Sequence, residues 1–177
     1  ESGYTLIMKN FFFSSLFFVF LTGCFATTYE VKGSYDMKAA SYVNEKGNSS
    51  IKGQAFMRQK GGTVVTCAGQ NINLFAVTEY SSQRMVILYK NTEKGYLDFV
   101  GRSIIKISPE APDEYFSVKK TTICDAQGNF KFKNLPANKE FFLTTKISWG
   151  VDYIPEGGYL MLKVKTIPNE TLEVILN

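Results

Sequence analysis

One stretch decides the predicted fold: Thr121-Thr122-Ile123-Cys124-Asp125-Ala126-Gln127-Gly128-Asn129-Phe130-Lys131-Phe132-Lys133-Asn134-Leu135-Pro136-Ala137. Its middle, Asp125 to Gly128, predicts a tight hairpin turn, because glycine readily takes the positive φ that such turns need. After the turn, Phe130 and Phe132 alternate with polar residues, and this two-residue period is typical of a strand with one buried face. The stretch therefore predicts a short β-hairpin whose phenylalanines lie in a protein core.

Strand patterns continue on both sides of this stretch. The segment from Gln70 to Val77 alternates cleanly, with Ile72, Leu74 and Ala76 expected on one face. Further strands are expected over residues 51–58, 141–149, 158–165 and 172–176, of which 141–149 is expected to be central. Turn signals roughly every eight to twelve residues separate the strands. The fold class is therefore predicted to be mainly β, a Greek-key β-sandwich of about seven strands.

Three segments resemble the carboxypeptidase regulatory-like domains: Gly53-Gln54-Ala55-Phe56, the run from Cys67 to Leu74, and the stretch from Thr121 to Ala137. Phe141-Phe142-Leu143 stands where that family has an aromatic strand. The resemblance covers residues 51–177 and implies that this region is a transthyretin-like sandwich.

Compared with a family member of minimal size, the chain has an insertion at about residues 78–115. Thr78 is expected to cap a helix that runs to about Asn91, with Lys94-Gly95 as stop signals. Strands are expected after it over residues 96–100, 103–107 and 115–123. The prediction is thus a sandwich with one short helical insertion over one edge or end of a sheet.

The N-terminal part resembles a bacterial lipoprotein precursor. An apolar run from Phe11 to Leu21 follows one lysine and has the length of a signal-peptide core, too short to span a bilayer as a helix. It ends in Leu21-Thr22-Gly23-Cys24, which resembles the lipobox, whose cysteine thiol receives a diacylglycerol before cleavage. We therefore expect residues 1–23 to be a signal peptide, with 1–7 a spurious extension upstream of Met8, and Cys24 to be lipidated. The alternative is a buried apolar helix that happens to end in cysteine.

Residues 24–50 are polar and contain several Gly, Ser and Lys residues. Such a composition buries too little apolar area to fold alone, so we expect a lipidated tether here and a globular domain over 51–177.

Two cysteines remain once Cys24 is assigned to lipid. Cys67 and Cys124 are then an even pair in an exported chain, and we expect a disulfide between them. The chain-entropy model gives a bridge of this span roughly 4 kcal/mol of stabilisation. The alternative is two separate buried thiols, and a Cα separation below about 7 Å is the condition that a bridge must meet.

The composition excludes several kinds of chemistry. The sequence contains no histidine, which removes Ser–His and Cys–His nucleophile pairs and His-ligated zinc. The acidic residues mostly flank turns and form no recognisable pair on facing strands. We therefore predict no catalytic residues, no metal site and no cofactor, and we expect the protein not to be an enzyme. The net charge of +4 comes from dispersed lysines and does not indicate a nucleic-acid partner.

The function expected first is that of a membrane-anchored, non-enzymatic envelope lipoprotein whose β-sandwich acts as a binding or structural module for a protein partner. Phe25 follows Cys24 in place of the aspartate that commonly signals inner-membrane retention in enteric lipoproteins. By that resemblance we expect the outer membrane, on its periplasmic side or at the cell surface.

The alternative function is a carbohydrate-binding module. Trp149, Tyr153 and Tyr159 bracket the segment from Gly150 to Gly158, which we expect to be a loop. Exposed, coplanar aromatic rings at this loop would stack on a sugar, whereas the same residues packed in the core would not. The exposure of Trp149 and Tyr153 therefore distinguishes the two functions.

Overall fold

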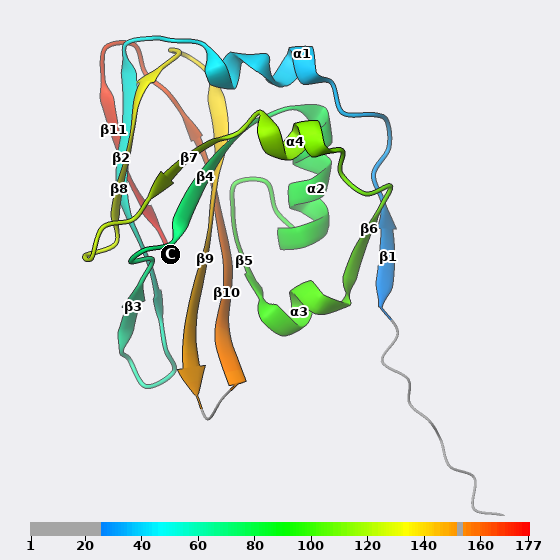
Figure 1. Ribbon diagram of the computed structural model, residues 1–177, viewed down its shortest axis with the longest axis vertical. Coiled ribbons are helices and arrows are strands. Elements are labelled where there is room, and N and C mark those ends of the chain that lie inside the picture. The colour runs from blue at the N-terminus through cyan, green and yellow to red at the C-terminus, as the bar shows by residue number, and fades with distance from the viewer. Residues whose placement is uncertain (1–25, 152–153) are drawn as a thin grey trace, which may run out of the picture.

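Two β-sheets stack face to face in the computed structural model, which describes residues 26–151 and 154–177 (Figure 1). The elements, in chain order, are β1 Thr27–Glu30, α1 Met37–Ala40, the 3-10 helix η1 Ser41–Asn44, β2 Ser49–Arg58, β3 Val64–Thr66, β4 Asn71–Ala76, α2 Glu79–Tyr89, β5 Lys94–Asp98, α3 Phe99–Ile104, β6 Ile105–Ser108, α4 Asp113–Ser117, β7 Lys120–Ile123, β8 Asn129–Leu135, β9 Glu140–Val151, β10 Ile154–Lys165 and β11 Thr171–Leu176.

The large sheet has five strands in the order β5-β10-β9-β4-β7, so the strand expected to be central, β9, is central. In the small sheet, β2 pairs with β11 in parallel and with β3 and β8 antiparallel. The predicted mainly-β sandwich is confirmed. Its two sheets hold five and four strands, more than the predicted seven, because β3 and the inserted β5 add to them.

The space between the sheets holds the first hydrophobic core, which we call the sandwich core. Phe130 and Phe132 of β8 lie in it, as predicted, and they face Phe141 and Leu143 of β9. The predicted disulfide between Cys67 and Cys124 is present, with a Cα separation of 5.8 Å, and both cysteines are buried in this core. The bond ties the end of the β3 segment to the end of β7.

The turn at Asp125–Gly128 is tight, but it does not connect a hairpin. Gly128 has φ +80°, and the Asp125 carboxylate accepts hydrogen bonds from the backbone N–H groups of Gln127 and Asn129 at 2.9 and 2.8 Å. However, β7 pairs with β4 in the large sheet, while β8 pairs with β2 in the small sheet. The hairpin prediction is therefore wrong: the turn carries the chain from one sheet to the other.

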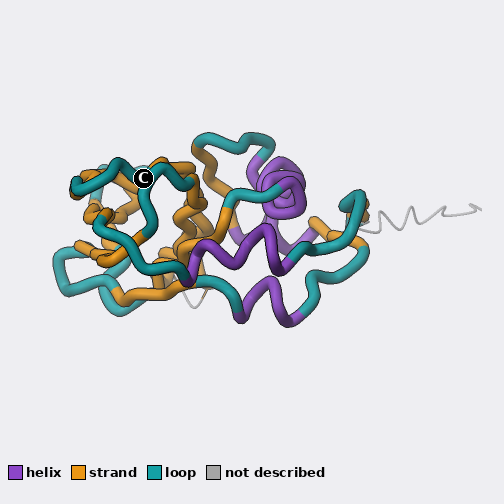
Figure 2. The backbone as a smooth tube through the Cα atoms, turned by 90° about the horizontal axis from the view of Figure 1, so that it is seen from above, coloured by secondary structure: helices purple, strands orange, loops and turns teal. Residues whose placement is uncertain are grey.

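The opposite face of the large sheet is covered by helices, so the molecule has three layers (Figure 2). This second core, which we call the helical-side core, contains Phe142 and Met161 from the sheet and Tyr80 and Met85 from α2. The predicted helix is confirmed as α2. Thr78 caps it in a reciprocal arrangement with Ser81.

The rest of the insertion differs from the prediction. It contains α3 and α4 in addition to α2, so the helical part is not one short helix. The segment expected as a strand over 103–107 begins inside α3, and the one expected over 115–123 begins inside α4. Both helices start at local signals that outweigh strand propensity: Asp98 accepts a hydrogen bond from the backbone of Gly101, and Pro112 precedes two acidic residues.

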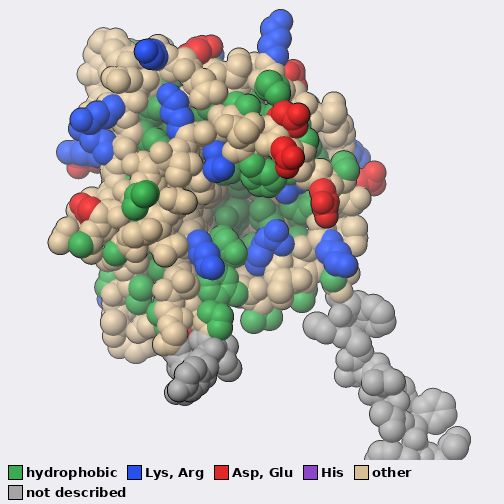
Figure 3. Space-filling view, in the orientation of Figure 1, with side chains coloured by type: hydrophobic (Ala, Val, Ile, Leu, Met, Phe, Trp, Pro, Cys, Tyr) green, Lys and Arg blue, Asp and Glu red, His purple; other side chains and the backbone are tan. Residues whose placement is uncertain are grey.

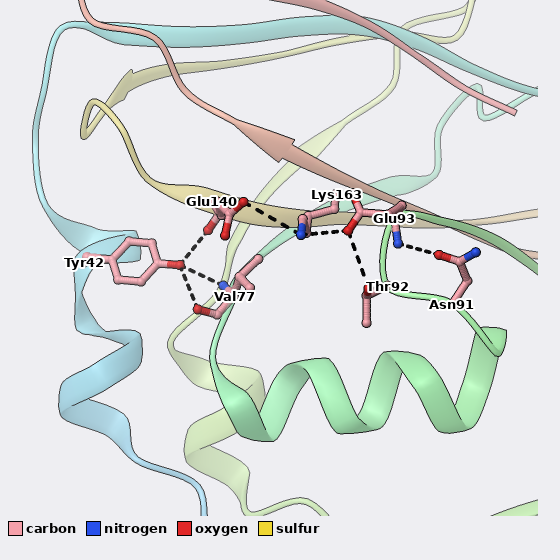
Figure 4. Close-up of polar contacts among 7 residues, drawn as sticks. All are labelled: Tyr42, Val77, Asn91, Thr92, Glu93, Glu140 and Lys163. Carbon is pink, nitrogen blue, oxygen red and sulfur yellow. Dashed lines mark hydrogen bonds and ion pairs between the residues drawn. The ribbon is translucent and has the colours of Figure 1, made fainter.

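The predicted tether is also wrong for the residues that the structure describes, because the chain folds from β1 onward. β1 pairs in parallel with β6, and Val31, Ala40 and Val43 are buried. The hydroxyl of Tyr42 accepts a hydrogen bond from Val77 N at 2.7 Å and donates one to Glu140 O at 2.5 Å (Figure 4). A few well-spaced apolar residues and this hydroxyl attach a segment whose average composition is polar. The predicted signal peptide and Cys24 lie outside the described residues.

Candidate binding site

Trp149 lies near the end of β9, not in a loop. Strands β9 and β10 remain paired as far as Val151 and Ile154, so most of the loop expected over 150–158 is strand. The cross-strand partner of Trp149 is Glu156, and the indole Nε1 donates a hydrogen bond to Glu156 Oε2 at 3.1 Å. The side chain is half-buried against the sandwich core. Packing and this hydrogen bond therefore fix the orientation of the indole while leaving part of it exposed.

Trp149 lines a groove of about 410 Å³ between the end of β2 and the paired strands β5, β9 and β10 of the large sheet. The groove's other lining residues are Phe56, Met57, Arg58, Tyr96, Leu160 and Asn177. Because β3 pairs with only three residues of β2, the small sheet is narrow at this end of the sandwich.

Tyr96 of β5 presents a second aromatic ring on the same face of the large sheet. It is paired with Leu160, whose side chain lies in the sandwich core. A Cβ atom at Gly158 would come within 2.8 Å of Tyr96 Cε2, so the ring lies over a position that only glycine can occupy. Tyr96 is 54% exposed. The groove thus carries two aromatic side chains on neighbouring parts of one face, with glycine backbone between them.

Polar groups surround the aromatic residues. The guanidinium of Arg58 is exposed and donates to Gly62 O at 3.1 Å, and Lys94 Nζ donates to Asn177 Oδ1 at 2.6 Å. An apolar floor with a few polar groups at its rim is the usual composition of a small-ligand site. Such a groove can bind a ligand that has both an apolar face and hydroxyl groups.

The other predicted binding residues do not join this groove. Tyr159 points to the opposite face of the large sheet, where its ring meets Phe99 edge to face at 5.6 Å. Tyr153 lies outside the described residues. The predicted trio is therefore not one patch in the structure, since the strand alternation sends Trp149 and Tyr159 to opposite faces.

A larger, shallower concavity of about 820 Å³ lies over β2, β8 and β11. Lys131, an exposed residue between Phe130 and Phe132 in β8, lines it, as do Lys52 and Glu173, which form an ion pair at 2.5 Å. No tryptophan or tyrosine is among the residues that line it. Lys and Arg side chains on the face drawn in Figure 3 are dispersed among uncharged ones.

Two further observations bear on chemistry and membrane attachment. In the described ranges, no three Asp, Glu, Cys or His side chains gather as a metal site would require. No helix within those ranges is long and apolar enough to cross a membrane.

Sequence reasoning missed Tyr96, Phe56 and Arg58 as groove residues. Their approach to Trp149 depends on the pairing of β5 with β10 and on the stacking of the two sheets, and no local pattern encodes either. One signal was present: the pair Gly157-Gly158 inside a strand pattern indicates a close approach by another group.

Comparison with known proteins shows the fold. No family model and no curated protein matches the chain. A crystal structure from Pseudomonas aeruginosa, described as that of a "putative carbohydrate binding protein", is similar, with a TM-score of 0.62 at 20% sequence identity. The match covers 75% of this chain and 89% of that chain. At this level of identity the match supports the β-sandwich architecture.

Proposed function

We propose that the protein is a membrane-anchored, non-enzymatic binding protein of the bacterial outer membrane whose Trp149 groove binds carbohydrate. The observation that carries the proposal is the placement of Trp149 and Tyr96 on one face of the large sheet, with Gly158 between them. Aromatic faces bind the apolar faces of sugar rings, and the polar rim around Arg58 and Asn177 offers donors and acceptors for hydroxyl groups. The description of the structurally similar protein is consistent with this ligand class.

The anchoring part of the proposal rests on the lipobox at Leu21 to Cys24. Because β1 begins at Thr27, only Phe25 and Ala26 separate the proposed lipidation site from folded structure. Four peptide units from Cys24 to Thr28 span at most about 14 Å, so the domain would lie directly against the membrane and not at the end of a long tether.

The groove and β1 lie on opposite sides of the molecule. In two perpendicular views, β1 lies at one edge of the molecule and the sandwich lies at the other, with the helices between them (Figures 1 and 2). The helical layer therefore separates the Trp149 groove from β1, the described strand that lies nearest in sequence to Cys24.

Carbohydrate binding is tested by titrating the purified full chain with neutral oligosaccharides, beginning with N-acetylglucosamine and glucose oligomers on an array and continuing by calorimetry. We expect Trp149→Leu and Tyr96→Leu to weaken binding at least tenfold, since stacking contributes about 1–3 kcal/mol for comparable aromatic contacts. Tyr159→Leu is the matched control, because this aromatic is on the same hairpin but on the other face. Wild-type protein that binds no saccharide, or equal binding by the Trp149 variant, would overturn the proposal.

Anchoring is tested separately by fractionating cells that express the full-length gene. The mature wild-type protein should be found in the membrane fraction with the mass of a chain that begins at an acylated Cys24. The Cys24→Ser variant should remain unprocessed, while its Cys67–Cys124 bond forms normally. Identical processing and mass for both proteins would exclude Cys24 as the lipid site.

A further inference from the structure

Arg84 of α2 is a buried charge that has no counter-ion among the residues that the structure describes. It is 9% exposed, and its Nη1 atom is fully buried with no hydrogen-bond partner among the described residues. The ion pairs within those residues are made by Lys52 and Lys163, not by Arg84. Because arginine does not lose its proton in proteins, it cannot avoid the cost of burial by becoming neutral.

The neighbours of Arg84 are aromatic rings. Its Cζ atom lies 5.3 Å from the ring centroid of Tyr115 and 5.8 Å from that of Tyr80. Burial raises the pKa of Tyr115, although the charge of Arg84 acts in the opposite direction, so this tyrosine is a neutral phenol at physiological pH. The rings stabilise the cation through their π faces, and a hydrogen-bonding contact of Arg84 with the Tyr115 hydroxyl also acts to lower the pKa of that tyrosine, but the Nη1 atom of Arg84 has no acceptor among the described residues. Arg84 thus retains an unused hydrogen-bond donor.

Arg84 also lines a cavity of about 500 Å³, which we call the Arg84 cavity. Arg102 of α3, whose Nη1 donates a hydrogen bond to Ile105 O at 3.2 Å, lines the same cavity, and so does Lys106 of β6. Glu110 is the acidic residue among the lining residues, so the cations outnumber the carboxylates in this space. Thr28 and Ser108 add hydroxyl groups. The cavity therefore combines excess positive charge, an unpartnered buried donor and room for a small ligand.

We propose that the Arg84 cavity binds an oxyanion, a carboxylate or phosphate group carried by a small ligand or by a lipid headgroup. Arg84 and Arg102 both line this cavity, and guanidinium groups suit the planar, bidentate recognition of such anions. The anion would provide the counter-charge that Arg84 lacks. A volume of this size accommodates a ligand of about one monosaccharide.

Thr28 of β1 lines the Arg84 cavity, and the position of this strand near Cys24 in the sequence favours a lipid headgroup as the anion. If Cys24 is lipidated as proposed above, Thr28 lies within about 14 Å of the lipidated residue along the chain, which brings the cavity to the level of the headgroups. The soluble source, such as a sugar phosphate or a uronic acid, does not depend on that anchoring. Both sources offer the same chemical group.

The test measures anion binding by the purified full chain at constant ionic strength. Inorganic phosphate, glucose 6-phosphate and glucuronate are titrated by calorimetry and by thermal unfolding, with glucose as the neutral comparison. We expect the anions, and not glucose, to raise the Tm of the wild type. Arg84→Met and Arg102→Gln should weaken anion binding at least tenfold, while Arg58→Gln, which changes an exposed arginine in the Trp149 groove, should leave it unchanged.

The stability of the Arg84→Met variant in the absence of anion gives a second test of the proposal. Arg84→Met removes an unpaired buried charge and keeps most of the side-chain volume, so without anion it should be at least as stable as the wild type. If this variant fails to fold, Arg102→Gln carries the binding test, because Arg102 is exposed. Anion binding that survives both substitutions, or the absence of any anion effect on the wild type together with the absence of vesicle binding, would overturn the proposal.

Vesicle flotation distinguishes the two sources. Binding to phosphatidylglycerol vesicles but not to phosphatidylcholine vesicles, lost in Arg84→Met and Arg102→Gln, would assign the site to a headgroup. Soluble anion binding without that vesicle preference would assign it to a free ligand. The outcome is independent of the groove, since Trp149→Leu should leave anion binding intact and Arg84→Met should leave binding of neutral saccharides intact.

Discussion

Phe141 and Phe142 are consecutive residues of β9, both fully buried, yet they belong to different cores. Phe141 lies in the sandwich core, which is mostly aliphatic and phenylalanine and is crossed by a disulfide. Phe142 lies in the helical-side core, where tyrosines with polar tips surround a buried arginine. The difference indicates that the two cores have different roles. One core holds the scaffold together, and the other, closed by short elements, leaves room for a charged cavity.

The largest expected effect tests whether the two cores are separate. Phe141→Ala and Phe142→Ala should each lower the free energy of unfolding by about 4 kcal/mol, because each deletes a buried aromatic side chain and leaves a cavity. Denaturant titration measures this loss, and hydrogen exchange locates it. Phe141→Ala should increase exchange in β2 and β8, whereas Phe142→Ala should do so in α2 and α4. The same exchange pattern for both variants would show that the cores unfold as one unit.

Sequence reasoning succeeded on the sandwich because its strands show their period locally. A buried strand face can be predicted from alternating apolar residues even when the partner strand is not known. Two such alternations are confirmed in the sandwich core, that of Ile72, Leu74 and Ala76 and that of Phe130 and Phe132. The disulfide followed from counting cysteines. Even there, the turn after Cys124 was misinterpreted, because a tight turn has the same local chemistry whether its flanking strands pair with each other or with different sheets.

The helical-side core could not be predicted in the same way. Most of its elements are short. Helix α3 is followed directly by strand β6, so the spacing of apolar residues changes from that of a helix to that of a strand within a few residues. The docking of β1 on β6 joins residues about eighty positions apart in the chain, for which no local pattern exists. The Arg84 cavity arises from this docking, so its two arginines gave no recognisable motif in the sequence.

The disulfide gives the next largest effect and should act on the sandwich alone. Replacing both Cys67 and Cys124 with alanine should lower the free energy of unfolding by no more than the roughly 4 kcal/mol of the chain-entropy model, chiefly because the unfolded chain regains freedom that the bridge removed. Urea unfolding of the oxidised wild type and the double variant measures the loss. A thiol reductant should destabilise the wild type and leave the double variant unchanged. An unchanged urea midpoint for the reduced wild type would show that the bridge contributes nothing to stability.

The smallest effect lies at Tyr42, which attaches the N-terminal segment to β9 and to the residue that follows β4, and both of these strands contribute to both cores. Tyr42→Phe removes the hydroxyl that bonds Val77 N and Glu140 O and should cost about 1 kcal/mol at neutral pH.

Burial raises the pKa of Tyr42 to about 12, with the charge of Glu140 acting in the same direction and the hydrogen bond to Val77 acting against it. A raised pKa in the folded state means that folding favours the neutral phenol. This contribution is therefore fully present below the unfolded value of about 10 and is lost as the pH rises from 10 to 12. The difference in unfolding free energy between the wild type and the variant should shrink over that interval. The other tyrosines with a raised pKa occur in both proteins, so their contributions cancel; they are Tyr35, Tyr89, Tyr96 and Tyr115. A difference that stays constant from pH 8 to about pH 11.5 would show that the hydroxyl is not held in its neutral form and that the attachment depends on apolar packing alone.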